Sequence, residues 1–170
     1  MRAIRESIKL HYSQLDRFPD IAENFAHIFP NAKYISITRR NILRQAISAT
    51  RANQTQSWES HNPERKKPRF NIFGILKYFM LIAKEIELWE NFYVANDIKP
   101  LRILYEDLDQ QYEKTMQEVV SFLEISGAIP PPPLKKQADV LNDIWAQRYV
   151  DLLKENRSFI RLFRFLMRCI

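Results

Sequence analysis

Residues 34–48 read YISITRRNILRQAIS, and this stretch decides the fold. A β-rich apolar run ends at two arginines, Arg39 and Arg40, and helix-forming residues follow directly. The first turn of a helix has backbone N–H groups without partners, and the helix dipole favours negative charge there. The two guanidinium groups add donors suited to phosphate oxygens. This stretch therefore predicts an α/β fold with a site for a phosphorylated ligand.

Ser48 is the second candidate at this site. It lies eight residues beyond Arg40, about two helical turns further on, so its hydroxyl can follow the same face of the helix. We expect Arg40 and Ser48 to bind one phosphate together. A plainer alternative is that Arg39, Arg40 and Arg44 form only a solvated helix face. The sequence leaves open whether Arg39 shares the role of Arg40.

Strand and helix patterns alternate along the rest of the chain. Strands are predicted over residues 7–12, 33–37 and 101–105, and helices over residues 19–28, 41–53, 72–96, 112–125, 138–154 and 157–170. Strands separated by helices pair in parallel through right-handed crossovers. The sequence therefore predicts a partial parallel sheet, of few strands, flanked by helices.

Composition narrows the class of protein. A length of 170 residues favours one domain, and the net charge of +6 favours an anionic ligand, nucleic acid or an anionic membrane surface. The single cysteine, Cys169, excludes an internal disulfide and fits a reducing, cytoplasmic location. Neither of the two glycines lies in a phosphate-cradling loop. We expect no transmembrane helix and no metal site.

Four segments together resemble a known family. They are TRRNILRQAISATRANQTQSW (38–58), WENFY (89–93), LRILYEDL (101–108) and QADVLNDIWAQRY (137–149). In this order they resemble the bacterial trehalose-type sulfotransferases, from about Ile8 to Tyr149. The resemblance implies a sulfotransferase fold akin to P-loop kinases and 3′-phosphoadenosine 5′-phosphosulfate (PAPS) as co-substrate. It also implies sulfuryl transfer to a hydroxyl of a carbohydrate or glycolipid.

The same resemblance implies roles for individual residues. In the wider superfamily, a strand-ending arginine and a serine eight positions later hold the 3′-phosphate of the cofactor, which corresponds to Arg40 and Ser48. A tyrosine at the end of the YEDL strand contacts the adenine, which corresponds to Tyr105. A plainer interpretation of Tyr105 is a core residue at a strand end.

One part of the family pattern has no match in this sequence. The family begins with a strand, a serine- and glycine-bearing loop and a helix that grip the 5′-phosphosulfate, and its general base lies in that part. We therefore expect residues 1–155 to form a sulfotransferase domain truncated at the N-terminus, with no catalytic residue assigned. The isolated chain is expected to be inactive.

Residues 156–170 are expected to form a separate amphipathic tail. Its arginines, at positions 157, 161, 164 and 168, follow helical spacing, with apolar residues on the other sides. We expect the tail to dock on this protein or another copy, or on a membrane. The basic charge also leaves a second hypothesis, a non-catalytic module that binds nucleic acid or a membrane surface. Steep salt dependence would distinguish such a module.

Overall fold

The computed structural model describes residues 7–58, 65–132 and 140–155, and the predicted tail lies outside them. These residues form two strands and seven helices. The elements are α1 (Tyr12–Leu15), α2 (Pro19–Ile28), β1 (Ile35–Thr38), α3 (Ile42–Thr55), α4 (Ile72–Ala95), β2 (Leu101–Leu104), α5 (Tyr105–Gln110), α6 (Tyr112–Leu123) and α7 (Val140–Glu155).

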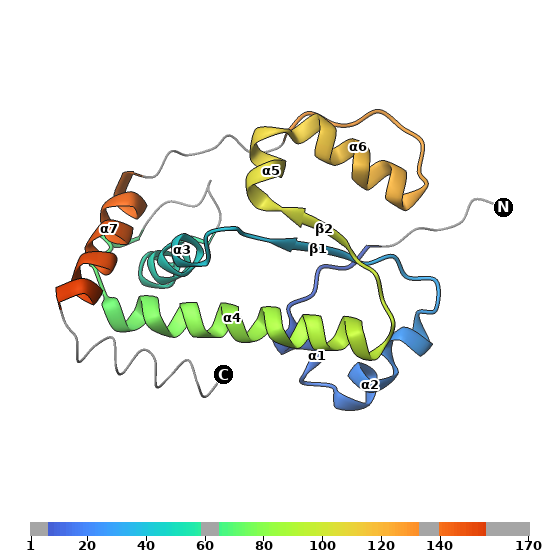
Figure 1. Ribbon diagram of the computed structural model, residues 1–170, viewed down its shortest axis with the longest axis horizontal. Coiled ribbons are helices and arrows are strands. Elements are labelled where there is room, and N and C mark those ends of the chain that lie inside the picture. The colour runs from blue at the N-terminus through green and yellow to red at the C-terminus, as the bar shows by residue number, and fades with distance from the viewer. Residues whose placement is uncertain (1–6, 59–64, 133–139, 156–170) are drawn as a thin grey trace.

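The two strands form a parallel pair, which confirms the predicted α/β class with a partial parallel sheet. Ile35 lies opposite Leu101, and Thr38 lies opposite Leu104. The chain crosses from β1 to β2 through α3 and α4. Figure 1 shows the strands between α4 on one side and α6 on the other. This register brings the carboxyl ends of both strands to the same edge of the sheet.

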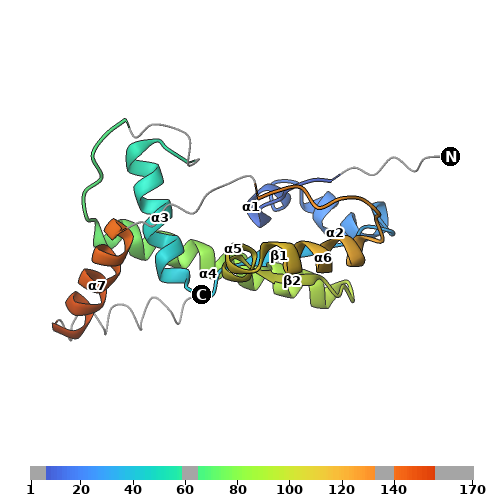
Figure 2. The same cartoon turned by 90° about the horizontal axis from the view of Figure 1, so that it is seen from above.

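The long helix α4 links two hydrophobic clusters. At its amino end Ile75 packs against Ala46 and Ile47 of α3, together with Trp145 and Tyr149 of α7. At its other end, Phe92, Tyr93 and Leu15 of α1 form the second cluster. In both views α3 and α7 lie toward one end of the molecule, and α1 and α2 toward the other (Figures 1 and 2). The first cluster therefore holds α3, the helix that begins at the candidate site.

No helix in the described ranges has both the length and the hydropathy that a membrane span requires.

The predicted strand over residues 7–12 is wrong. Residues 7–11 have no strand partner, and α1 begins at Tyr12. The backbone N–H of His11 donates to Gln14 Oε1 at 2.8 Å, which closes the first turn of α1. Alternating polarity alone does not make a strand, because a strand needs a neighbour to satisfy its backbone groups. Within the described residues the sheet therefore has two strands in place of three.

Candidate functional site

The predicted turn from strand to helix is present. β1 ends at Thr38, and α3 begins at Ile42 after the cap residue Asn41. The Asn41 side-chain oxygen accepts a hydrogen bond from the backbone N–H of Arg44 at 3.0 Å. Arg40 therefore lies between the carboxyl end of a strand and the amino end of a helix, as the sequence predicts.

The end of β2 brings a second set of side chains to the same place. Tyr105 follows β2 directly and begins α5, so the strand predicted to include it is one residue shorter. The Arg39 guanidinium carbon lies 4.0 Å from the centroid of the Tyr105 ring, a cation–π arrangement. Arg40 Nη2 lies 3.3 Å from Asp107 Oδ1. The arginines after β1 thus meet the residues after β2.

Both predicted ligand-binding side chains of this edge are accessible. Tyr105 is 37% exposed, which disfavours its interpretation as a core residue. The side chain of Arg40 is 66% exposed, and the carboxylate of Asp107 that it contacts is 44% exposed. The Arg40 guanidinium is therefore open to solvent although it pairs with Asp107.

Glu106 is bound to the backbone of this turn. Its Oε2 accepts the backbone N–H of Arg40 at 3.0 Å, and the backbone N–H of Asn41 also acts on its pKa. Burial by itself raises the pKa of Glu106, but these backbone hydrogen bonds and the positive charge of Arg39 outweigh it. The net effect is a pKa below the ordinary value of 4.5. Glu106 is therefore an anion at neutral pH.

Ser48 lies further along α3. It is half-buried, and its position corresponds to about 9 Å along the helix axis from Ile42. The contacts that join Arg39, Arg40 and Tyr105 to their neighbours do not involve Ser48. A shared role of Ser48 and Arg40 remains a prediction.

Each arginine of the stretch has a specific neighbour. Besides the contacts of Arg39 and Arg40, Arg44 forms an ion pair with Asp143 of α7. These contacts are more specific than those of a purely solvated helix face. Arg44 therefore connects the start of α3 to α7, and its guanidinium is already engaged.

Glu106 and Asp107 are the residues that sequence reasoning missed. The sequence places them directly after the predicted strand 101–105 and assigns them no role. A signal was present, because acidic residues directly follow one strand and arginines directly follow the other. Using that signal requires knowing that the two strands are neighbours in the sheet.

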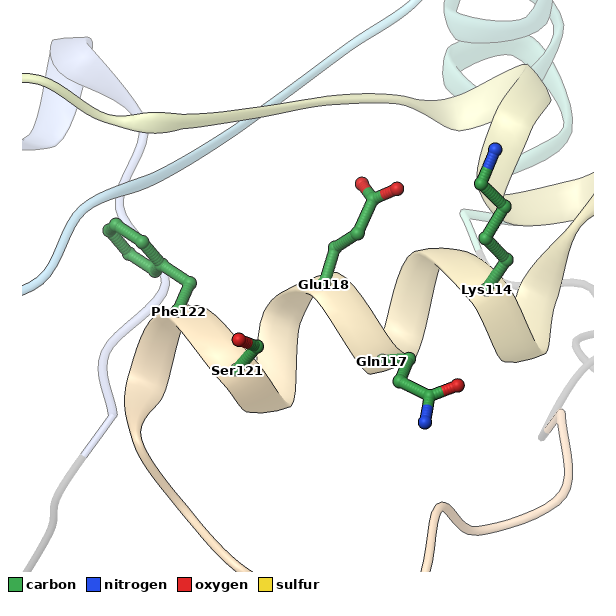
Figure 3. A pocket seen from close by; sticks show the side chains of 5 residues that line it. All are labelled: Lys114, Gln117, Glu118, Ser121 and Phe122. Carbon is green, nitrogen blue, oxygen red and sulfur yellow. The ribbon is translucent and has the colours of Figure 1, made fainter.

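Two hollows lie along α6, near this cluster. One of about 540 Å³ is lined by residues of α6: Lys114, Gln117, Glu118, Ser121 and Phe122. Figure 3 shows Lys114 and Glu118 projecting from the same side of α6. A smaller hollow of about 170 Å³ shares these two residues and extends to Asp107. Arg40 and Tyr105 line neither of these two hollows.

Comparison with known proteins supports the same family as the motifs. The family model described as Stf0 sulphotransferase matches residues 1–151. The chain is 26% identical over 119 residues to the trehalose 2-sulfotransferase of Mycobacterium tuberculosis (strain ATCC 35801 / TMC 107 / Erdman), covering 68% of this chain and 45% of that protein. It is also 26% identical over 118 residues to the trehalose 2-sulfotransferase of Mycolicibacterium smegmatis (strain ATCC 700084 / mc(2)155), covering 68% and 44%. The chain thus spans about half the length of these curated relatives. Because the family match covers most of its length, the chain belongs to the Stf0 sulphotransferase family.

Proposed function

We propose that this chain binds the adenosine 3′-phosphate end of PAPS in a sulfotransferase. The sulfotransferase would transfer the sulfuryl group to a hydroxyl of a carbohydrate or glycolipid. Arg40 and Ser48 would bind the 3′-phosphate, and Tyr105 would contact the adenine. One observation carries the proposal: Arg40 and Tyr105 follow two parallel strands in register and lie at one edge of the sheet. Ligands of open α/β sheets bind at this carboxyl edge. The names of the relatives, both trehalose 2-sulfotransferases, suggest the acceptor class.

The proposed residues suit binding of the nucleotide better than catalysis of sulfuryl transfer. Sulfuryl transfer resembles phosphoryl transfer, in which positioning and stabilisation of the developing charge dominate. Arg40, Ser48 and Tyr105 would hold the nucleotide at a phosphate that is remote from the reacting sulfur. No residue of this chain is assigned to the 5′-phosphosulfate or to the acceptor proton. We therefore propose that the 170-residue chain binds the nucleotide but does not transfer the sulfuryl group alone.

The charges around Arg40 favour a compact phosphate over a polyanion. Arg40 is paired with Asp107, and Arg44 with Asp143. Glu106 adds a further negative charge beside Arg39. Nucleic acid binding draws on many unpaired cations along a surface, with counterion release at each phosphate. Positive and negative charges nearly balance here, which supports the nucleotide over the nucleic-acid alternative.

Calorimetry with adenosine 3′,5′-bisphosphate tests the proposal. Arg40→Ala removes a charge-assisted phosphate contact worth about 1.5–3 kcal/mol, so the affinity should fall about ten- to hundredfold. Lys67→Ala is the matched control, because it removes one positive charge from an exposed loop position. The control should bind within about twofold of wild type, as a screened surface charge contributes little. Equal affinity of wild type and Arg40→Ala, or equal loss in both variants, would contradict the proposal.

A further inference from the structure

Carboxylates of α5 hold Arg40 at two points. Glu106 Oε2 accepts its backbone N–H at 3.0 Å, and Asp107 Oδ1 lies 3.3 Å from its guanidinium Nη2. The backbone N–H of Asn41 also helps to lower the pKa of Glu106. The residue that we propose to bind phosphate is therefore fixed through its main chain by one acidic residue and through its side chain by the next.

The hydrogen bonds from Glu106 act on the part of the chain that aims Arg40. Rotation about the backbone bonds of residues 40 and 41 sets the direction of the Arg40 side chain relative to α3. The Asn41 side chain is already engaged with the N–H of Arg44. The N–H of Arg40 donates to Glu106, and hydrogen bonds to an ionised acceptor are stronger than neutral ones. The turn is therefore ordered before any ligand arrives.

We infer that Glu106 is a positioning residue for the 3′-phosphate of the nucleotide: its carboxylate holds the Arg40–Asn41 turn so that Arg40 and Ser48 face the same phosphate. This inference rests on the proposed function. Asp107 has a different role, because it pairs with the Arg40 guanidinium and the phosphate would replace it as the partner of that group. Glu106 keeps its backbone partners when the ligand binds.

The opposite role for Glu106 would be repulsion of the ligand, because a carboxylate near a phosphate repels it. The position of Ser48 argues against this as the dominant effect. A phosphate that contacts both Arg40 and Ser48 lies beside α3, since Ser48 is about 9 Å along the helix from its first residue. Glu106 is bound to the turn that precedes this helix. The two anions therefore use different donors.

The test compares two ligands in three proteins. Titrations of ¹⁵N-labelled full chain with adenosine 3′,5′-bisphosphate and with adenosine 5′-monophosphate give both affinities. Glu106→Gln, which keeps the shape and removes the charge, should weaken bisphosphate binding about tenfold, equivalent to about 1.4 kcal/mol. The monophosphate affinity should stay within about twofold. Glu113→Gln is the control, because it removes the same charge from an exposed position in the first turn of α6 and should change neither affinity.

The same spectra report on the turn itself. In Glu106→Gln the Arg40 amide proton should shift upfield and exchange faster with solvent, because its charged acceptor is lost. Tighter bisphosphate binding by this variant would mean that Glu106 occupies the phosphate position. Equal weakening of both ligands would show that Glu106 has no specific effect on the 3′-phosphate. An unchanged Arg40 amide or an unchanged affinity ratio would show that Glu106 does not position the turn. Each of these results overturns the inference.

Arg40→Ala separates this failure from failure of the proposed function. If wild type binds the bisphosphate and Arg40→Ala does not, the proposed function stands whatever Glu106→Gln shows. If wild type shows no bisphosphate binding, or Arg40→Ala binds as well as wild type, the proposed function fails and the role of Glu106 fails with it.

Discussion

Gly74 in the first turn of α4 allows α3 to pack closely, and Gly74→Ala should destabilise the protein. A Cβ at this position would lie 3.1 Å from the Thr50 Cγ2 methyl and 3.0 Å from Asn71 Nδ2. Thr50 is 2% exposed, and its hydroxyl donates to the Ala46 carbonyl at 2.8 Å. Because this hydrogen bond fixes the rotamer, the methyl cannot turn away from the new side chain.

The expected loss follows from two opposing effects. Alanine is favoured over glycine by about 1 kcal/mol in the interior of a helix, and by less in a first turn. An additional methyl group in a packed site costs about 1–3 kcal/mol. The steric cost should exceed the gain in helix propensity, so Gly74→Ala should lower the free energy of unfolding by about 1 kcal/mol. A shift of α3 would also move Ser48.

A double-mutant cycle measured by urea unfolding checks this reasoning. Thr50→Ser keeps the hydroxyl and removes the methyl, so Gly74→Ala should cost less in that background, where only the contact with Asn71 remains. The coupling energy should be about 1–2 kcal/mol, within the range for contacting residues. Gly127→Ala is the control, because no atom lies within 4 Å of its added Cβ. Equal destabilisation by Gly74→Ala in both backgrounds, or none in wild type, would refute the role assigned to the Thr50 methyl.

Three further predictions concern stability and activity. Ile47 is fully buried, so Ile47→Ala should lower the free energy of unfolding by about 2–4 kcal/mol, as measured in urea. The side chain of Ile37 is 60% exposed, so Ile37→Thr should change the free energy of unfolding by no more than about 0.5 kcal/mol. Hydrogen bonds from Arg102 lower the pKa of Glu90, and the pKa of Glu106 is also lowered, so both carboxylates stabilise the fold above the ordinary value of 4.5. That contribution should be lost as the pH falls below 4.5 through the lowered values, and Glu90→Gln should show a shallower loss in urea titrations between neutral and acidic pH. The purified chain should transfer no sulfuryl group from PAPS to trehalose, as followed by mass spectrometry, and turnover would require a 5′-phosphosulfate site within these 170 residues.

Helices with local end signals were predictable from the sequence. The helix predicted over residues 19–28 is α2, which begins at Pro19 as the first-turn preference of proline suggests. The helix predicted over residues 72–96 is α4, Ile72–Ala95. Helical hydrogen bonds join residues four apart, so periodicity and capping residues carry most of the information.

Strand assignments depended on information outside the local segment. Residues 7–12 alternate like a strand, yet α1 begins at Tyr12 and residues 7–11 pair with no strand. The segment after β2 forms α5, where the sequence pattern predicts no helix. A strand exists only where another strand supplies hydrogen-bond partners, and short segments of either kind are ambiguous in isolation.

For the site, the sequence by itself determined the strand ending in two arginines and the helix after it, and the motifs indicated the family. The tertiary structure alone decided what these arginines meet. Arg40 and Glu106 are 66 residues apart in the chain, and their hydrogen bond exists because β1 and β2 pair in parallel with Thr38 opposite Leu104. Parallel pairing through a long crossover is a non-local event, and it places the charges that follow both strands at one edge of the sheet.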